Sequence, residues 1–298
     1  MRSELPEGLT CAFHERCAVR AETAALAFAG ARLRLCLVRK AICFSAGKIL
    51  GKLRALPPLC VIFENSDFLV VDKPPFQMVH PKKPAGAGTL WHELKQLLAF
   101  ELVNGGQISF INHLDRETSG LVLVAKNRRA ARQLNRLMEG NAISKRYTAI
   151  VTGWPEAELF TVNQPLLPQR LVRSSQIWLK QTVHLEGYPS ITEFKVLRQF
   201  VRKEGRFSVI EAEPKTGRTH QIRVHLSFAG YPIVGDKIYG PDETCYLEFI
   251  KTSWTPALQS KLLLPRQALH ATRLAFTLGL DPFEFSVPLP PDLTEFVA

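Results

Sequence analysis

Asp115 stands in a stretch whose residues could do chemistry, NHLDRETSG at 112–120. The apolar segments on both sides of it predict strands, which give a catalytic residue a rigid base. Thr118 and Ser119 can hydrogen-bond the local backbone, and Gly120 permits a conformation or a close approach that a side chain would block. These features indicate a turn that holds the Asp115 carboxylate in place. The structural alternative is an Asx-type turn, because Asp is enriched in turns.

A second carboxylate, Glu117, lies two residues after Asp115. Paired carboxylates are typical of glycoside hydrolases. However, Glu117 lies toward the turn, and no other acidic residue stands out as a partner for Asp115. A glycosidase is therefore a weaker hypothesis than the one developed below.

Basic residues gather in PKTGRTHQIRVHL, which leads into a predicted helix over 219–230. Lys215 and Arg218 precede the helix start, where the backbone dipoles favour anions. His220 and Arg223 are three residues apart and therefore share a helix face. The group is suited to binding phosphates or a carboxylate. The structural alternative is a solvated basic helix end.

Tyr147 lies in SKRYTAI, on a predicted strand. A tyrosine in this setting most often packs in a core. Beside Lys145 and Arg146, it could instead stack on a nucleobase, as aromatic side chains do in RNA sites.

Short strands and amphipathic helices must position these residues. Alternating and apolar runs predict strands at 60–65, 68–73, 107–112, 121–127, 145–153 and 206–214. Helical spacing predicts helices at 89–100, 128–139 and 219–230, with Thr89, Asn127 and Thr219 as N-caps and Gly140 and Gly230 as stops. Strands outnumber helices and do not alternate strictly with them. We therefore expect an α+β fold with a mixed, mostly antiparallel central sheet and flanking helices.

The chain has 298 residues and a formal net charge of +11. Residues 1–60 hold ten Lys or Arg and four Asp or Glu, so the rest of the chain is only moderately basic. A basic chain fits a polyanionic partner such as RNA. Residues 1–57 are rich in Ala, Leu and Arg and end at a Pro-Pro break, which predicts an N-terminal extension or small accessory region followed by a folded domain over 58–298.

Metal binding is not expected. Cys11, His14 and Cys17 have spacing that resembles a metal cluster, but no second pair of ligands follows them. His220 and His225 are five residues apart and would point in different directions on a helix. The sequence also has no apolar span of membrane length and no signal peptide, so we expect a soluble, cytoplasmic protein with reduced thiols.

Five ordered segments resemble the RNA pseudouridine synthases of the RluA type. They are FLVVDKPPFQMVHP (68–81), NHLDRETSGLVLVAKN (112–127), KRYTAIVTG (145–153), KTGRTHQIRVHL with GYPIVGDKIYG (215–240), and ALHATRLAFTL with FSVPLPPD (268–292). The resemblance runs from about Leu59 to the last residue and so covers the expected folded domain. It implies the pseudouridine synthase fold with an active-site cleft. It also implies isomerisation of uridine to pseudouridine in structured RNA, ribosomal or transfer, without a cofactor.

The resemblance also implies residue roles. By position, Asp115 matches the family's catalytic aspartate, Tyr147 the tyrosine that stacks on the target uracil, and Arg223 the arginine that pairs with the carboxylate. Desolvation would raise the pKa of a buried Asp115, and a guanidinium opposes this shift and keeps the carboxylate ionised. An ionised carboxylate suits both routes that remain open, attack at ribose C1′ or removal of a ribose proton to give a glycal.

One position departs from the family pattern. His113 stands where the family usually has an arginine that is thought to fill the gap left by the flipped base. A neutral imidazole can stack and donate one hydrogen bond, but it lacks the fixed charge of arginine. The alternative to an isomerase is therefore an RNA-binding or RNA-chaperone protein on the same fold, with weak or no catalysis. We further expect a monomer that binds RNA through His113, Arg116, Thr118, Lys215, Arg218, His220 and Lys73.

Overall fold

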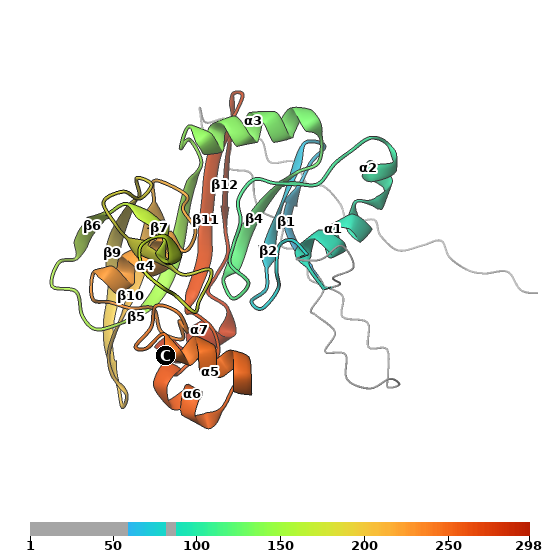
Figure 1. Cartoon of the computed structure of the whole chain (residues 1–298). Helices are drawn as coiled ribbons and strands as arrows, with labels where there is room; N and C mark the ends of the chain where they lie inside the picture. The colour runs from blue at the N-terminus through green and yellow to red at the C-terminus, as the bar shows by residue number, and fades with distance from the viewer. Residues whose placement is uncertain (1–58, 82–87) are drawn as a thin grey trace, which may run out of the picture. The chain divides into compact units, whose positions relative to one another are not determined.

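A computed structural model describes residues 59–81 and 88–298 of the chain (Figure 1). Its strands are β1 (Cys60–Glu64), β2 (Phe68–Lys73), β3 (Ser109–Phe110), β4 (Ser119–Ala125), β5 (Ser144–Thr152), β6 (Leu159–Asn163), β7 (Leu166–Pro168), β8 (Gln181–Val183), β9 (Ile191–Arg202), β10 (Gly205–Pro214), β11 (Leu269–Leu278) and β12 (Asp281–Ser286). Its helices are α1 (Leu90–Leu97), α2 (Ala99–Val103), α3 (Arg128–Glu139), α4 (Gln221–Phe228), α5 (Thr244–Thr252), α6 (Pro256–Leu262) and α7 (Pro291–Val297), with a 3-10 turn at Gln169–Leu171. The predicted N-terminal extension, 1–57, lies outside the described residues.

The described strands confirm the expected α+β class. One large sheet has the strand order β1-β2-β4-β11-β5-β10-β9-β6, with β12 also beside β11 and β3 beside β4. Neighbouring strands in this sheet are antiparallel except β4 and β11, which are parallel. The parallel pair matters for function because it places the start of β4, next to Asp115, beside the start of β11.

Both faces of the sheet are buried around β2 and β4. Leu69 and Val71 of β2 belong to one core cluster, with side chains of α1, α4 and α7. Phe68 and Val70 belong to a second cluster on the opposite face, with side chains of α3 and β12. Successive strand residues point to opposite faces, so both must be apolar when helices or strands cover both faces. In Figure 1, α3 crosses the sheet near the ends of β4, β11 and β12.

Two predicted helix starts are confirmed. Asn127 caps α3 by accepting a hydrogen bond from the backbone N–H of Ala130, and the helix ends at Gly140 as expected. Thr89 caps α1 through the N–H of His92. The predicted helix 89–100 is instead two helices that meet at Leu98, whose side chain is buried in the core.

The predicted cap at Thr219 is wrong. Helix α4 begins at Gln221, and its N-cap is His220, which adopts a left-handed backbone conformation with φ of +57°. The Gln221 amide holds the preceding loop, because it accepts from the N–H of Arg218 and donates to the carbonyl of Ile191. Thr219 is exposed. The turn before α4 is therefore held by a side chain inside the helix instead of by a cap.

Among the described residues, no helix is long and apolar enough to cross a bilayer.

Candidate active site

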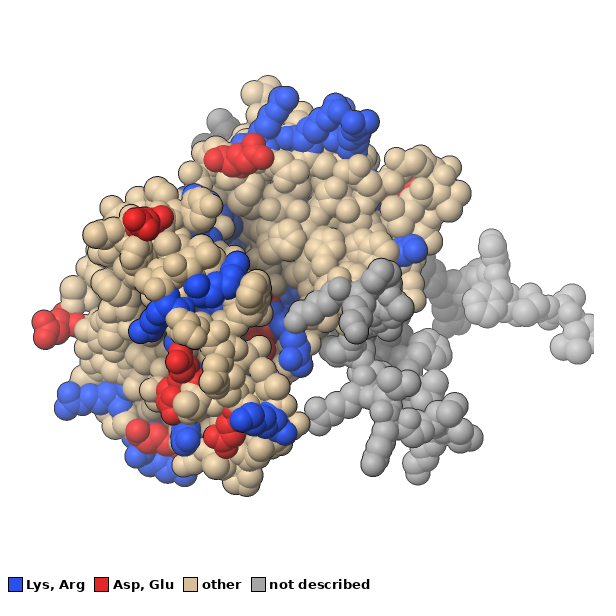
Figure 2. All heavy atoms as spheres, in the orientation of Figure 1, with Lys and Arg blue, Asp and Glu red and all other residues tan. Residues whose placement is uncertain are grey.

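The residues predicted to do chemistry surround one pocket of about 440 Å³. This volume is typical of small-ligand sites. Its wall comes from the segment before β4, from β5, from the loop after β10 and from α4, with Asp115, His113, Tyr147, Arg218, His220 and Arg223 among the lining residues. Lys and Arg side chains border the hollow between the β4 side and the β9–β10 side of the molecule (Figure 2). The sequence therefore predicted a group of residues that the fold does bring together.

Asp115 is fixed through one of its two carboxylate oxygens. Arg223 Nη1 donates to Oδ2 at 2.8 Å, and Gln267 Nε2 donates to the same oxygen at 3.2 Å. The other oxygen, Oδ1, accepts no hydrogen bond from any described residue, and the Nε2 atom of His220 lies 3.8 Å away. The side chain is 30 % exposed, within the pocket. Asp115 thus presents an oriented carboxylate with one free oxygen.

A second, fully buried aspartate orients Arg223. Asp236 accepts two hydrogen bonds from this guanidinium, from Nε at 2.6 Å and from Nη2 at 2.9 Å. The Asp236 carboxylate also accepts from the backbone N–H groups of Ile238 and Tyr239. The ring of Tyr239 lies 5.0 Å from the guanidinium carbon. Because the planar fork of Arg donates in several directions, one side chain can bridge two carboxylates.

The charges in this network keep Asp115 ionised. Burial would raise the pKa of Asp115, but His220 in its protonated form and the Arg223 guanidinium outweigh it, so the pKa of Asp115 lies below its usual value. Burial lowers the pKa of His220 to about 4, so its imidazole is neutral at neutral pH. Arg223 is therefore the cation that acts there. Burial alone would lower the pKa of Arg223, but Asp236 and then Asp115 raise it.

His220 reaches the site because of its left-handed backbone. Its Nδ1 atom lies 2.9 Å from the hydroxyl of Tyr239, which in turn accepts from the backbone N–H of Gln181. The other ring nitrogen, Nε2, is the one that lies near Asp115, 3.8 Å from Oδ1. Tyr239 was not among the predicted site residues.

Side chains distant in sequence hold the loop that carries Asp115. Gln267 Nε2 donates to Thr118 Oγ1 at 2.9 Å, and Ser119 Oγ lies 2.9 Å from Nδ1 of His270. We expected Thr118 and Ser119 to bond the local backbone, but Thr118 bonds to Gln267, just before β11, and Ser119 contacts His270 in β11. Thr118 is buried and does not line the pocket.

Gly120 follows this loop at a point where no side chain fits. Its φ is +112°, and a Cβ atom would lie 2.3 Å from the carbonyl oxygen of Ala271. The contact arises because β4 and β11 pair in parallel at these two residues. The expected close approach is confirmed.

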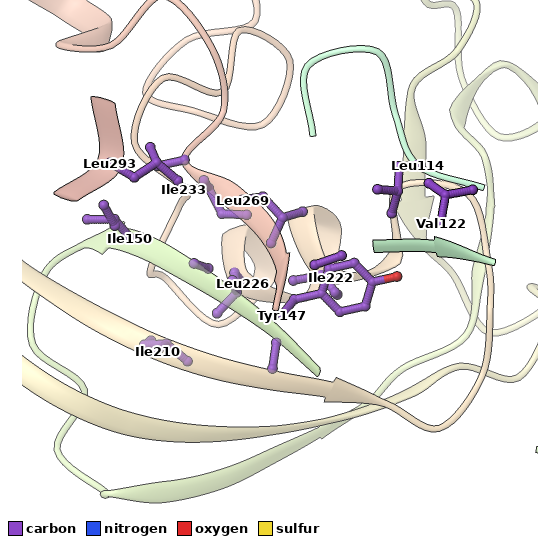
Figure 3. Close-up of a cluster of buried hydrophobic side chains, with 14 of the residues drawn as sticks. Leu114, Val122, Tyr147, Ile150, Ile210, Ile222, Leu226, Ile233, Leu269 and Leu293 are labelled. Carbon is purple, nitrogen blue, oxygen red and sulfur yellow. The ribbon is translucent and has the colours of Figure 1, made fainter. Parts of the chain in front are cut away.

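Tyr147 lies at the edge of the buried core. It is 8 % exposed, and its ring belongs to the same cluster as Ile222 and Leu269, which also line the pocket. Its hydroxyl points toward the side of Leu114 and away from Ile150 (Figure 3). Burial, followed by the nearby Asp115 charge, raises the pKa of Tyr147, so the hydroxyl stays protonated.

Two predicted RNA-binding residues lie on the pocket rim. His113 is exposed and stacks on His80, with ring centroids 5.6 Å apart, and burial lowers its pKa. Arg218 is exposed, donates to the carbonyl of Pro189, and lies over the ring of Tyr188 at 5.6 Å.

The other predicted contacts lie outside the pocket lining. Lys73 is fully buried and donates to the carbonyls of Pro74 and Gln77, with a longer contact to that of Arg116 at 3.4 Å. Burial lowers the pKa of Lys73 to about 7. Lys215 is paired with two glutamates outside the pocket, Glu213 at 2.8 Å and Glu193 at 2.9 Å.

Arg116 and Glu117 follow Asp115 on the same loop and point elsewhere. Arg116 is exposed and donates to the carbonyl of Phe76. Both carboxylate oxygens of Glu117 accept from the buried Lys237 amine at 2.9 Å. Glu117 does not line the pocket, so it cannot act with Asp115 as a paired-carboxylate glycosidase requires.

Within residues 59–81 and 88–298, no group of three or more His, Cys, Asp or Glu side chains is placed to hold a metal ion. The Cys11, His14 and Cys17 segment lies outside these ranges.

Comparison with known proteins identifies the family. Residues 67–228 match the family described as RNA pseudouridylate synthase. The uncharacterized RNA pseudouridine synthase YlyB of Bacillus subtilis is 34% identical over 243 residues, which are 80% of this chain and 72% of that protein. Ribosomal large subunit pseudouridine synthase D of Salmonella typhimurium is 31% identical over 247 residues, 80% of this chain and 70% of that protein.

A solved structure shares the fold. The human RNA Pseudouridylate Synthase Domain Containing 1 superposes with a TM-score of 0.60 and 26% sequence identity, over 79% of this chain and 86% of that chain. The family match covers more than half of the chain, and both curated relatives exceed 30% identity. The chain therefore belongs to the RNA pseudouridine synthases of the RluA type, which isomerise uridine in RNA.

Proposed function

We propose that Asp115 is the reacting carboxylate of this enzyme and that its target is a uridine in ribosomal or transfer RNA. One observation carries the first part. Asp115 lines the pocket, and Arg223 and Gln267 hold its Oδ2 atom, while Oδ1 accepts no hydrogen bond from the described residues. A carboxylate that is ionised, oriented and free at one oxygen has the properties that the isomerisation requires.

The reaction balances without an external reagent. Asp115 Oδ1 either attacks C1′ of the ribose or removes its C2′ proton, and in both cases the C1′–N1 bond breaks and the uracil leaves with its electron pair. The uracil turns within the pocket, and its C5 atom forms a bond to C1′. In the first route the bond between Asp115 and C1′ breaks as this bond forms, and in the second Asp115 returns the proton to C2′, so both routes regenerate the free carboxylate. C5 then loses its proton and N1 gains one, so that the product is an isomer of the substrate.

The neighbouring groups support these steps. Arg223 keeps Asp115 ionised until it reacts, because Asp236 holds the guanidinium in place. The Tyr147 ring is an apolar surface at the pocket wall on which a flipped uracil can stack. Its neutral hydroxyl adds no charge to repel the leaving uracil. Taking the target nucleotide out of its stack costs a few kcal/mol, about the cost of unstacking one base.

The RNA class rests on a relative's name. Pseudouridine synthase D of Salmonella typhimurium is named for the ribosomal large subunit. This similarity favours ribosomal RNA as the first substrate to test.

A pseudouridine map tests both parts of the proposal. Total RNA is compared between a deletion strain and the same strain carrying either the wild-type protein or Asp115→Asn. We expect at least one site to disappear on deletion and to return only with the wild type, and that site identifies the RNA. Restoration of the site by Asp115→Asn would overturn the role of Asp115, and an unchanged map would support the alternative of an RNA-binding protein.

A further inference from the structure

We propose that the arginine stripe of α3, formed by Arg128, Arg132 and Arg136, binds the phosphate backbone of the RNA whose uridine enters the pocket. This inference rests on the proposed function, because it assumes that an RNA strand occupies the pocket. It adds a second contact region, on the face of the molecule where α3 covers the sheet.

The spacing of the three arginines places them on one face of the helix. They are four residues apart, so neighbouring side chains lie about 6 Å apart along the axis. All three are exposed. On the opposite face, Ala130, Ala131 and Leu134 are buried in the core cluster beneath α3. The stripe is therefore a row of charges on a rigidly held helix.

These arginines have no acidic partner among the described residues, whereas their neighbour does. Arg129 lies on the same helix, is 74 % exposed, and pairs with both oxygens of Asp67, at 2.9 and 3.1 Å. No ion pair joins Arg128, Arg132 or Arg136 to a carboxylate within residues 59–81 and 88–298. Their positive charge is therefore available to an anionic ligand.

The stability of α3 does not account for the position of Arg128. A helix N-terminus carries positive partial charge, so acidic residues stabilise the first turn and basic residues destabilise it. Helix α1 follows this rule with Glu93, and α7 follows it with Asp292. The first turn of α3 contains Arg128 and Arg129 and no acidic residue. A negatively charged ligand would compensate for this unfavourable charge.

The C-terminal end of α3, which carries the stripe, lies beside the active site. Met138, two residues after Arg136, lines the pocket. Lys145, which also lines the pocket, directs its amine to the Met138 sulfur at 3.4 Å. Figure 2 shows basic side chains gathered over α3. An RNA strand that leaves the pocket beside Met138 therefore reaches the C-terminal end of α3 first, where Arg136 is the last arginine of the stripe.

Phosphate is the ligand chemistry that fits this row. The planar guanidinium binds phosphate oxygens with paired hydrogen bonds, and an RNA strand supplies regularly spaced phosphates. Contacts of this kind carry no sequence information, but they set the register of the strand on the protein. They also release counterions, which gives the proposal a measurable signature in the salt dependence of binding.

The test compares the stripe with its paired neighbour. A fluorescently labelled oligouridine RNA of about 20 nucleotides is titrated with each full-length protein at salt concentrations from about 50 to 200 mM. The proteins are the wild type, the triple variant Arg128→Gln/Arg132→Gln/Arg136→Gln, and the matched control Arg129→Gln. Gln keeps the helix propensity close to that of Arg, and thermal unfolding verifies that each variant is folded.

We expect the triple variant to lower the salt slope of binding by about 2, since each lost phosphate contact to a single strand removes about 0.7. Its affinity at about 50 mM salt should fall at least tenfold. Arg129→Gln should leave both values near those of the wild type. Equal slopes for the triple variant and the control, or no binding of the RNA by the wild type at low salt, would overturn the inference.

A parallel assay separates this inference from the proposed function. The same proteins are incubated with total RNA from the deletion strain, and pseudouridine is measured. If the wild type forms no pseudouridine while the triple variant still has the lower salt slope of RNA binding, the isomerase assignment fails and α3 remains an RNA-binding helix. If the wild type is active and the triple variant and the control have equal salt slopes, only the proposed role of the stripe is wrong.

Discussion

Two carboxylates on one loop, Asp115 and Glu117, are two residues apart and serve different purposes. Each pairs with a cation from the segment that follows β10: Asp115 with Arg223 and Glu117 with Lys237. Both oxygens of Glu117 are bound by the Lys237 amine, whereas one oxygen of Asp115 faces the pocket unbound. A carboxylate is therefore chemically useful here when its partner leaves one oxygen free.

The two cations explain this difference. Arg223 uses Nε and Nη2 on Asp236 and reaches Asp115 with Nη1 alone. Lys237 has one nitrogen, which also donates to the carbonyl of Pro265. The guanidinium of Arg223 donates hydrogen bonds to two carboxylates, whereas the single amine of Lys237 donates to both oxygens of one carboxylate. We therefore propose that Arg223 serves the reaction and that Lys237 supports the loop.

Replacing Arg223 with Leu should have the largest effect. It leaves Asp236 charged, fully buried and without its cation, which costs about 3–5 kcal/mol of unfolding free energy. Activity should fall at least about 10³-fold, because Asp115 also loses the group that orients it. Urea unfolding and the rate of pseudouridine formation measure the two effects.

A double variant controls for the buried charge. In Arg223→Leu/Asp236→Asn the Asn side chain keeps an acceptor for the N–H groups of Ile238 and Tyr239 but carries no charge. It should recover much of the stability and none of the activity. If activity returned with stability, Arg223 would be a purely structural residue.

Glu117→Gln tests the other half of the comparison. It removes the carboxylate from the buried Lys237 amine, so the unfolding free energy should fall by about 1–3 kcal/mol. Activity should fall less than about tenfold, because the Asp115 contacts remain. A loss comparable with that of the Arg223 variant would mean that the two carboxylates are not functionally separate.

Acid should destabilise the protein through its histidines before it affects these carboxylates. Burial lowers the pKa of His220 and of His270 to about 4, from 6.5 for an unperturbed imidazole, and it lowers that of His225 in the same direction. Between about pH 4 and pH 6.5 these histidines therefore bind more protons in the unfolded state than in the folded state. Stability is therefore complete above about pH 6.5 and is lost as the pH falls toward 4, by about 1.4 kcal/mol per pH unit for each such histidine.

The carboxylates respond at lower pH. The pKa of Asp115 and that of Asp236 are both lowered from 3.8, so their contribution to stability is present above that value and is lost below it. Chemical unfolding at a series of pH values tests this order. A stability that stays constant from pH 7 to pH 4 would rule out neutral, buried histidines around the site.

His113→Arg should have the smallest effect. His113 lies on the pocket rim, stacked on His80, and contacts none of the groups that hold Asp115. The family arginine at this position should change kcat/KM on structured RNA by less than about tenfold, mainly through KM. A change confined to kcat would instead place His113 in the base-flipping or chemical step.

The sequence predicted the residues of the site better than the contacts that arrange them. Asp115, Tyr147 and Arg223 do line one pocket. Asp236 and Gln267 were missed, although both lie in or beside segments that resemble the family. Their roles arise because parallel pairing of β4 with β11 and the turn after α4 bring distant residues together, and no local pattern reports such pairing.

The errors in the predicted elements have a similar origin. Thr219 is of a residue type that is favoured at N-caps, but the side chain of Gln221, inside the helix, holds the turn instead. Thr118 and Ser119 are of residue types that often bond to the backbone of their own turn. Instead, Thr118 bonds to Gln267 and Ser119 to His270. Thr118 and Ser119 thus make tertiary hydrogen bonds in place of the local ones that their residue types favour. Gln221 combines a local bond to Arg218 with a tertiary bond to Ile191. The capped start of α3 was predictable, because its cap is local.

The most direct measurement is the release of the uracil C5 proton in a single turnover. RNA labelled with tritium at C5 of uridine releases the label when C5 bonds to C1′, whichever route Asp115 takes. With enzyme in excess, we expect Glu117→Gln to release tritium at a rate within about tenfold of the wild type, and Asp115→Asn to release at least about 10³-fold more slowly while binding the RNA equally well. Release at the wild-type rate by Asp115→Asn would show that another group reacts with the ribose.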